Sequence, residues 1–585
     1  MSRNVRISFC MLALSAASHA ATAAEPVPPA TRWIPDNAVI CIELNRPKAL
    51  LETLANDDAC KAIQALPAFQ SLKAGPQVGG LLTVIKVLEA SLETDWRTGL
   101  GTLTGGGITF AICADGSALT IIESEDERML TRLHEILLGF ARGEADKAGQ
   151  PGRVVSAEYM GVTGWTFNGK EAHAVVANRM ISANRPEALK AALELRSNSG
   201  GANLTSRDDY QKVRKMVAPD AIGMIYVNME VFRNIPGLAG ALDKGSQNPL
   251  AALLFAGIID AVRNSTAMGV GLYAKESTLT LEALLDGKLI DPKGPAAFAL
   301  PPAGAGAPPL LTAPRCIASL SFHRDLHSFY AAKDSLFPER TGGLIFFENM
   351  MGIFFSGRDL TDEVLARTTP DVRFVVARQE YDPKNGTPQV QIPGFALVLK
   401  LRDAEAFDEI AEEAWQKAVG LINFTRGQQG LPGLIIDRPT HNGTKFTAAY
   451  FSTAGIEETT NLHARFNFRP ALALPADYLI LSTSDGLARD LIDAATAEAS
   501  QSPKPAAGVH TMAQLDGGQL ASILRANYDA LVRQNMVSKG NSREAAETTI
   551  GLLITVAGFV DEVTLTIGAE KELTRARLQL ALNLQ

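Results

Sequence analysis

The chain has 585 residues, enough for several domains of roughly 100–200 residues and for large cores that need no disulfide staples. Hydrophobic residues make up 46% and charged residues 20%, as in globular rather than disordered or fibrous proteins. The formal net charge is −8 and no lysine/arginine cluster offsets it, so we expect repulsion of phosphate backbones and no nucleic-acid partner.

Residues 1–24 have the pattern of a secretory signal peptide. Arg3 and Arg6 precede the apolar run "ISFCMLALSAAS", and small residues near Ala20 to Ala24 offer cleavage sites. The run is too short to span a membrane, and no later segment reaches about eighteen unbroken apolar residues. We therefore expect export to the periplasm or the extracellular space, with a soluble mature chain that has no transmembrane anchor.

The cysteines leave their redox state open. Four remain after signal removal, namely Cys41, Cys60, Cys113 and Cys316. Four cysteines allow three full pairings, and the sequence does not choose among them. A Cys41–Cys113 bridge and small buried thiols are both compatible with the apolar stretches around these two residues.

The first half, residues 31–288, alternates apolar strands with amphipathic helices. The stretch "AVICIELNRPKALLETL" predicts a strand that runs into a helix, and Asp115-Gly116 predicts a tight hairpin turn followed by a long helix. Shorter strands and further helices follow. Side-chain caps are predicted at Asn228 and Asn248, and capping boxes at Ser124/Glu127 and Asn184/Glu187.

Residues 289–314 are dense in proline, glycine and alanine and predict a stiff linker. The second half, residues 315–585, repeats the pattern of the first in the same order. Its predicted caps are Asp403, Ser484, Asp516 and the box Asn541/Glu544. Short turns between consecutive strands favour antiparallel pairing. We therefore predict an α+β protein of two tandem similar modules, each a mostly antiparallel sheet with helices packed on it.

Three stretches carry a family resemblance: "IPDNAVICIELN", "LGTLTGGGITFAI" and "YVNMEVF". In this order they resemble a group of exported proteins from planctomycete-like bacteria that is known only as a domain of unknown function. In that group a Pro-Asp entry leads to the first strand, a glycine turn leads to the second hairpin, and the module is duplicated. The resemblance spans most of residues 33–285 and, more loosely, 314–585, where "APRCIASL" lacks the Pro-Asp entry and "RTTPDVRF" lacks the glycines. It implies export and an envelope role, and it brings no catalytic residues.

The triplet Gly105–Gly107 could suggest a phosphate loop or an oxyanion loop. A phosphate loop follows a strand and opens a helix, whereas these glycines precede the strand-like stretch "ITFAI". The nucleophile elbow that accompanies oxyanion glycines, G-x-S-x-G, does not occur in the sequence. We interpret the triplet as the turn before a strand.

A candidate metal pair is His323 and His327 in "HRDLH", which would share one helix face if the segment is helical. Arg324 stands where a metalloprotease would need glutamate, so two solvated histidines are the alternative interpretation. No other motif predicts a cofactor or a catalytic residue.

The sequence favours a non-enzymatic role. We expect an exported envelope protein that binds or scaffolds an unknown envelope protein or ligand through a broad surface. The alternatives are an exported hydrolase, assisted by a metal at His323 and His327, and a small-ligand carrier that binds between the two modules.

Overall fold

The structure is a computed structural model. It describes residues 29–54, 76–167, 169–197, 201–235, 237, 240, 244, 248–286, 294–381, 386–454, 456, 460–570 and 573–583. The predicted signal peptide, Cys60 and the first residues of the predicted linker lie outside this part of the chain.

Strands of both halves join in one sheet. The strands of the first half are β1 (Ala38–Leu44), β2 (Gly107–Cys113), β3 (Ala118–Glu123), β4 (Val155–Tyr159), β5 (Val162–Thr166), β6 (Ala172–Val176), β7 (Arg179–Ala183), β8 (Gly223–Asn228), β9 (Ala267–Lys275) and β10 (Thr278–Leu285). Those of the second half are β12 (Cys316–His323), β13 (Thr368–Ala377), β15 (Gly394–Leu401), β16 (Ile435–Asp437), β17 (Thr440–His441), β18 (Thr444–Tyr450), β20 (Ala471–Ala473), β21 (Tyr478–Ser482), β23 (Val509–Asp516), β24 (Val560–Glu570) and β25 (Leu573–Leu582).

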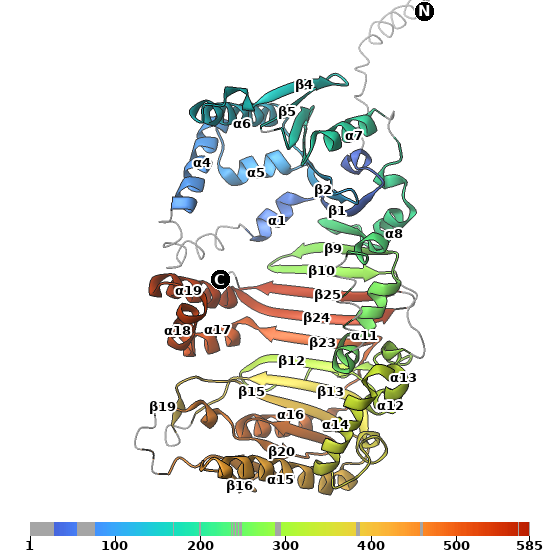
Figure 1. The fold of residues 1–585 in the computed structure, drawn as a ribbon, viewed down its shortest axis with the longest axis vertical. Helices are drawn as coiled ribbons and strands as arrows, with labels where there is room; N and C mark the ends of the chain where they lie inside the picture. Colours follow the sequence, from blue (N-terminus) through green and yellow to red (C-terminus); the bar gives the residue numbers. More distant parts are fainter. Residues whose placement is uncertain are drawn as a thin grey trace, which may run out of the picture.

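The sheet is antiparallel throughout this series. Neighbouring strands run β4–β5–β6–β7–β3–β2–β1–β8–β9–β10–β25–β24–β23–β12–β13–β15–β21–β20–β18–β16. Figure 1 shows these strands stacked along the long axis of the molecule, with β9, β10, β25, β24 and β23 in the middle. With helices packed on the sheet, the protein belongs to the α+β class, as the sequence predicts.

The helices occupy matching places in the two halves. Between the first two strands of each half lie α1 (Pro47–Leu54), α4 (Pro76–Leu92) and α5 (Trp96–Thr104), or α12 (Leu326–Ala331), α13 (Lys333–Leu336) and α14 (Thr341–Phe354). After the third strand comes α6 (Glu127–Lys147) or α15 (Ala404–Gln428). Later connections hold α7 (Pro186–Arg196), α8 (Asp208–Met216), α9 (Met229–Phe232) and α11 (Pro249–Asn264), or α16 (Asp485–Gln501), α17 (Gly517–Ala526), α18 (Tyr528–Lys539) and α19 (Arg543–Phe559).

Counted outward from β10 and β25, the strands of the two halves follow the same order along the chain. Each strand from β10 to β4 has a counterpart from β25 to β16. The counterpart helices α4 and α14 also share a short sequence near their starts, Gly-Gly-Leu at 79–81 and at 342–344. A duplication would produce this pattern, although duplication itself stays a prediction.

The two halves meet at the pair β10–β25. The register places Thr278 opposite Ala581, Leu281 opposite Leu578 and Leu285 opposite Thr574. Because the two strands are counterparts and run antiparallel, a pseudo-twofold axis passes through this pair. The central strands make the halves one continuous sheet.

Helices cover the two faces of the sheet differently. On one face, α7 and α16 pack on the outer strands and α8 packs on β8 and β9. Together they enclose buried side chains such as Ile121, Ile181, Val375 and Ile480. On the opposite face, α15 packs through Phe407 and Trp415. There α6 packs too, since His134 contacts His173 of β6. The layers are therefore thickest over the outer strands.

The glycine triplet forms the predicted turn before a strand. Gly105 ends α5, and β2 begins at Gly107, whose φ of 128° favours glycine. A Cβ at Gly106 would lie 2.8 Å from the Cβ of Glu123, so the close approach to β3 also requires a small residue. The tight turn at Asp115-Gly116 is confirmed as well, because it joins β2 and β3 and Gly116 has a φ of 79°.

Several predicted caps are confirmed and others are wrong. The side chains of Asn228, Asn248, Asp403 and Asp516 each accept from a first-turn amide. The helix predicted to start at Ser124 is capped by Asp126, and the one predicted at Asn541 is capped by Ser542. Asn184 caps no helix, because its side chain accepts from Ala118 N and donates to Gly116 O. Ser484 holds the N-cap position of α16, but its hydroxyl makes no capping hydrogen bond.

The predicted linker is not an exposed hinge in its described part, from residue 294 onward. It packs along the second half, forming the helical turn η4 (Pro295–Phe298) and β11 (Gly306–Ala307), which pairs with β22 (Ala506–Ala507). Leu311 is buried, and the hydroxyls of Ser319 and Ser321 donate to the carbonyls of Leu311 and Pro308. The segment packs in this way because β12 supplies the donors that a proline-rich segment cannot find within itself.

Arg324 ties the second half to α11 of the first half. It follows β12 directly and is 2% exposed. Its Nε donates to Leu253 O at 2.7 Å and its Nη2 to Leu254 O at 2.9 Å, both in α11, while Nη1 donates to His510 O at 2.9 Å. Burial lowers the pKa of Arg324 to about 10. The guanidinium therefore acts as a buried donor that fastens one half to the other.

Four histidines are buried, two of them in direct contact. The Nε2 atoms of His134 and His173 lie 3.1 Å apart, which requires one donor and one acceptor and therefore favours two neutral rings. Burial lowers the pKa of His173 to about 4 and that of His510 to about 3, and it also lowers the pKa values of His134 and His323.

We expect Arg324→Met to lower the free energy of unfolding by about 3 kcal/mol, because buried carbonyls lose their donors. Arg543→Met is the matched control. Arg543 is exposed and pairs with Glu547 one turn away, so its loss is expected to leave the unfolding midpoint nearly unchanged. Urea denaturation of the full chain measures both, and equal midpoints for the two variants would contradict the role assigned to Arg324.

We also expect acid to destabilise the protein. The folded pKa values of the buried histidines lie below the unfolded value of about 6.5, so the unfolded state binds more protons between about pH 4 and 6.5. Stability is thus fully present above this window and falls as the pH drops through it. His173→Gln is expected to reduce the slope by up to about 1.4 kcal/mol per pH unit. Unfolding measured at several pH values tests this, with the part-exposed His327→Gln as control, and identical slopes for the two variants would refute it.

Candidate functional site

Seven exposed apolar side chains lie on one face of the sheet. They are Ile42, Ile112, Leu281, Phe374, Phe395, Leu481 and Leu578. Among the described strand residues outside the edge strands β4 and β16, no other large apolar side chain is exposed. The strand registers place all of them on the same side. We call this side the apolar face.

Apolar cross-strand neighbours connect these residues into a row. Leu281 lies opposite Leu272 on β9 and Leu578 on β25, and Leu578 lies opposite Leu565 on β24. Toward the second half, the row continues from Leu565 through Ala513 and Leu320 to Phe374. Toward the first half, Leu272 lies opposite Gly223, and the neighbouring row through Val270 and Ile225 leads to Ile42. Directly opposed side chains in a sheet touch one another. The apolar face therefore crosses from one half to the other without a break.

The apolar face is uncovered at the seam, whereas α11 packs beside it on the same face, where Ala261 and Val262 cluster with Ile225 and Met268. Leu281 and Leu578, at the seam between the halves, are 39% and 38% exposed. In Figure 1, α17–α19 lie beyond one end of the central strands, and α12 and α13 lie toward the other. The opposite face of the same strands is polar, with Glu282 accepting from Arg577 at 2.8 Å. Contiguous exposed apolar surface of this kind is typical of binding sites.

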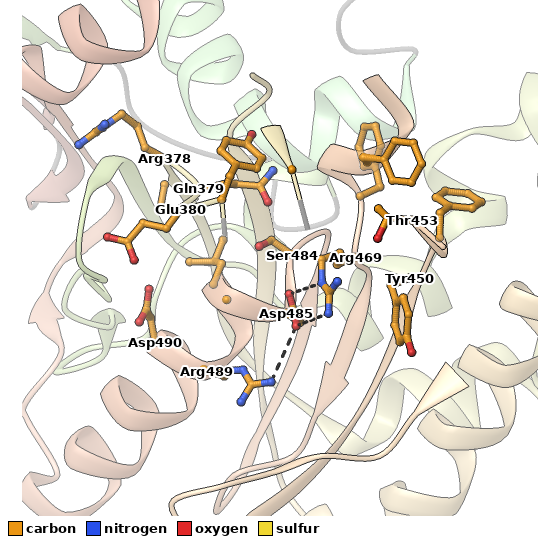
Figure 2. Close-up of a pocket in the computed structure, with 18 of the residues that line it drawn as sticks. Arg378, Gln379, Glu380, Tyr450, Thr453, Arg469, Ser484, Asp485, Arg489 and Asp490 are labelled. Carbon is orange, nitrogen blue, oxygen red and sulfur yellow. Dashed lines mark hydrogen bonds and ion pairs between the residues drawn. The ribbon is translucent and has the colours of Figure 1, made fainter. Parts of the chain in front are cut away.

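A separate pocket lies at the start of α16 in the second half (Figure 2). It encloses about 720 Å³. Its charged side chains include Arg315, Arg378, Glu380, Arg469, Asp485, Arg489 and Asp490, and its aromatic ones are Tyr381, Tyr450, Phe451, Phe466 and Phe468. The pocket thus combines a charged part with an aromatic part.

Ion pairs organise the charged part. Asp485 accepts from Arg469 twice, at 2.9 Å from Nε and 3.2 Å from Nη2, while Nη2 of Arg489 lies 3.8 Å away from the same carboxylate. Arg315 lies between Glu380, at 2.7 Å, and Asp490, at 3.2 Å. Burial raises the pKa of Asp490. Figure 2 shows the Asp485 pairs at the centre of the pocket, with Glu380 and Asp490 on one side and Tyr450 on the other.

Two groups in this pocket invite comparison with a catalytic serine and histidine. Ser484 is in the first turn region of α16, where its carbonyl accepts from Ser482 Oγ and its amide donates to the same oxygen. His441 turns its Nε2 to Asp493, at 2.9 and 3.0 Å from the two carboxylate oxygens. The ring of His441 therefore contacts a carboxylate and not a hydroxyl. Ser484 is the residue at which α16 begins.

The predicted metal pair does not share a helix. His323 is the last residue of β12 and is buried, whereas His327 lies in α12 with its Nε2 4.0 Å from Asp362. Asp325, between them, caps α12 by accepting from Ser328 N. Within the described ranges, no group of three or more His, Cys, Asp or Glu residues is placed to hold a metal ion. The prediction that His323 and His327 share one helix face, on which the metal site depended, is therefore wrong.

Three of the four cysteines can be placed. Cys41, Cys113 and Cys316 are free thiols, with Cys41 and Cys113 buried. Burial raises the pKa of each of the three. They behave as small apolar core residues in this structure, one of the two possibilities that the sequence left open.

In the described part of the chain, no helix combines the length and apolarity needed to cross a bilayer.

No family model and no curated protein matches the chain. Crystal forms I, III and IV of a protein named TP0453 are similar to part of it, at 9%, 10% and 11% identity. They cover 46%, 45% and 44% of this chain and 81% of the other, with TM-scores of 0.24, 0.25 and 0.24. Scores this low carry no argument about fold or function.

Proposed function

We propose that this chain is a non-enzymatic binding protein of the cell envelope, exported by residues 1–24, and that the apolar face is its working surface. The observation that carries the proposal is the run of opposed apolar side chains that crosses the seam from Leu272 through Leu281 and Leu578 to Phe374, with Ile42 on the same face. The occupant is an apolar ligand or the apolar surface of an envelope partner.

The free energy available to an occupant comes from water release. Fully burying a leucine or phenylalanine side chain contributes about 1.5–3 kcal/mol, and each side chain of the row is still partly exposed. Leu281 and Leu578 are direct neighbours, so an occupant lying across the seam gains from both halves at once. Binding of this kind needs no reacting groups.

A small-ligand carrier is the second candidate. The sequence suggests a ligand held between the modules, and the seam β10–β25 lies in the middle of the apolar face. A ligand at the seam would contact side chains of both halves. This carrier and a protein-binding role use the same surface and differ in the size of the occupant.

The matching strand order of the two halves supports a second inference, about how the halves arose. We infer that the two halves arose by duplication of a single α+β module. The matching strand order and the shared Gly-Gly-Leu of α4 and α14 support this inference. A duplication with a closing antiparallel seam explains why the apolar row is continuous.

We expect Leu281→Gln to weaken binding of the neutral apolar dye Nile red by about five- to tenfold, because one side chain of the row loses its apolar contact area. Thr280→Gln, one position along β10, points to the opposite face and is the matched control. Fluorescence titration of the full mature chain gives both dissociation constants. The proposal fails if the wild-type chain does not bind the dye, or if the two variants bind it equally.

Export is tested separately. Residues 1–24, fused to an alkaline phosphatase that lacks its own signal, are expected to give activity outside the cytoplasm, where that enzyme forms its disulfides. Leu12→Asp together with Leu14→Asp interrupts the apolar run and is expected to abolish the activity. Equal activity of both fusions would contradict export by this segment.

A further inference from the structure

The pocket of Figure 2 exists because two connections are longer in the second half than in the first. Strands β2 and β3 are joined by residues 114–117, but their counterparts β13 and β15 by residues 378–393. Strands β5 and β6 are joined by residues 167–171, but β18 and β20 by residues 451–470. More than half of the residues that line the pocket lie in these two longer connections. The pocket is thus an addition to the shared fold.

Asn467 fastens the two connections to each other. It is fully buried, and its Nδ2 donates to Val390 O and Ala464 O, both at 2.8 Å. Its Oδ1 accepts from Tyr381 Oη at 2.6 Å and from Ile392 N at 2.9 Å. The short strands β14 (Thr387–Pro388) and β19 (Thr460–Leu462) add a backbone pairing between the same connections. A wall with this many satisfied polar groups is built and held in place.

The charges of the pocket favour an anion. Four arginines line it against three carboxylates, Glu380, Asp485 and Asp490. Because Arg469 already holds Asp485 through two hydrogen bonds, Arg489 lies beyond hydrogen-bonding distance of that carboxylate. The adjacent start of α16, whose N-cap Ser484 makes no side-chain cap, adds the positive end of a helix dipole. Arg489 also lies over the Phe446 ring, 5.1 Å from its centre, so an incoming anion would add a hydrogen-bonding partner to a guanidinium held by one ring contact and one long ion pair.

The other side of the pocket favours a flat apolar group. Tyr450, Phe451, Phe466 and Phe468 line it, and the Arg469 guanidinium lies 4.9 Å from the centre of the Tyr450 ring. Aromatic walls stack or pack edge-on against other rings. A volume of about 720 Å³ is in the range of small-molecule sites.

We propose that this pocket binds a small anionic molecule that carries a planar ring, with Arg489 contacting the anion and Tyr450 and Phe468 contacting the ring. The site is distinct from the apolar face, because it opens at the start of α16, which packs on the opposite face of the sheet. It therefore goes beyond the proposed function, and either can fail without the other.

Three probes separate the two kinds of contact: benzoate has an anion and a ring, benzyl alcohol has the ring alone, and acetate has the anion alone. Ligand-observed NMR with the full mature chain is expected to show benzoate bound about tenfold or more tightly than either of the others. Arg489→Gln is expected to weaken benzoate binding about tenfold and to leave benzyl alcohol binding unchanged. Arg489→Lys keeps the charge and is expected to retain most of the affinity for benzoate.

The first half supplies the matched control. Arg185, the N-cap residue of α7, is as exposed as Arg489 and pairs with Asp115, so Arg185→Gln removes a comparable ion-paired arginine away from the pocket. It is expected to leave benzoate binding unchanged. The proposal is overturned if the wild-type chain does not bind benzoate, if benzyl alcohol binds as tightly, or if Arg489→Gln binds benzoate as tightly as the wild type. Because Arg489 is 39% exposed, its loss is not expected to unfold the protein, and urea denaturation checks this.

Discussion

The antiparallel pairing of β10 with β25 is the constraint on which the rest of the structure depends. Each strand would otherwise be the edge of its own half, with unpaired amides and carbonyls open to other chains. Pairing them satisfies both edges and fixes the register, so that Leu281 meets Leu578 on one face and Glu282 meets Arg577 on the other. The apolar face and the polar face of one half therefore continue as the apolar face and the polar face of the other. The buried donor Arg324 reinforces the join at the level of the helices.

The sequence predicts the parts of this fold that local chemistry decides. The turn at Gly116 and the caps at Asn228 and Asp516 depend on residues within one turn of the chain, and the structure confirms them. The errors occur where a distant segment competes for the same polar atom. Asn184 bonds to the turn of β2–β3 instead of capping α7. The packing of the proline-rich segment likewise depends on a distant strand, since the carbonyls of Pro308 and Leu311 accept from hydroxyls on β12.

The candidate binding surfaces could not be predicted from the sequence. Alternation along a strand such as "TLTLEALL" shows that it has two unlike faces, but not which face the helices leave uncovered. Only the registers across the whole sheet show that Ile42 and Phe374 belong to the same face. The pocket brings together segments near residues 315, 380, 450, 469 and 489, which no local pattern connects. A comparison of loop lengths between the two halves is the one signal in the sequence that could have pointed to it.

A comparison of the two halves distinguishes features that both halves share from features that only one half has. Features present in both halves, such as the apolar face, follow from the strand order that the halves share and from the seam that joins them. Features present in one half need extra chain and extra ordering. Ordering a residue costs about 1–2 kcal/mol of backbone entropy. In the described parts of the two long connections, residues 378–381, 386–393, 451–454, 456 and 460–470, buried contacts such as those of Asn467 offset that cost. Burying the sheet does not require these longer connections, since the first half does so with short turns. The pocket that they enclose is therefore where we expect a specific polar ligand to bind.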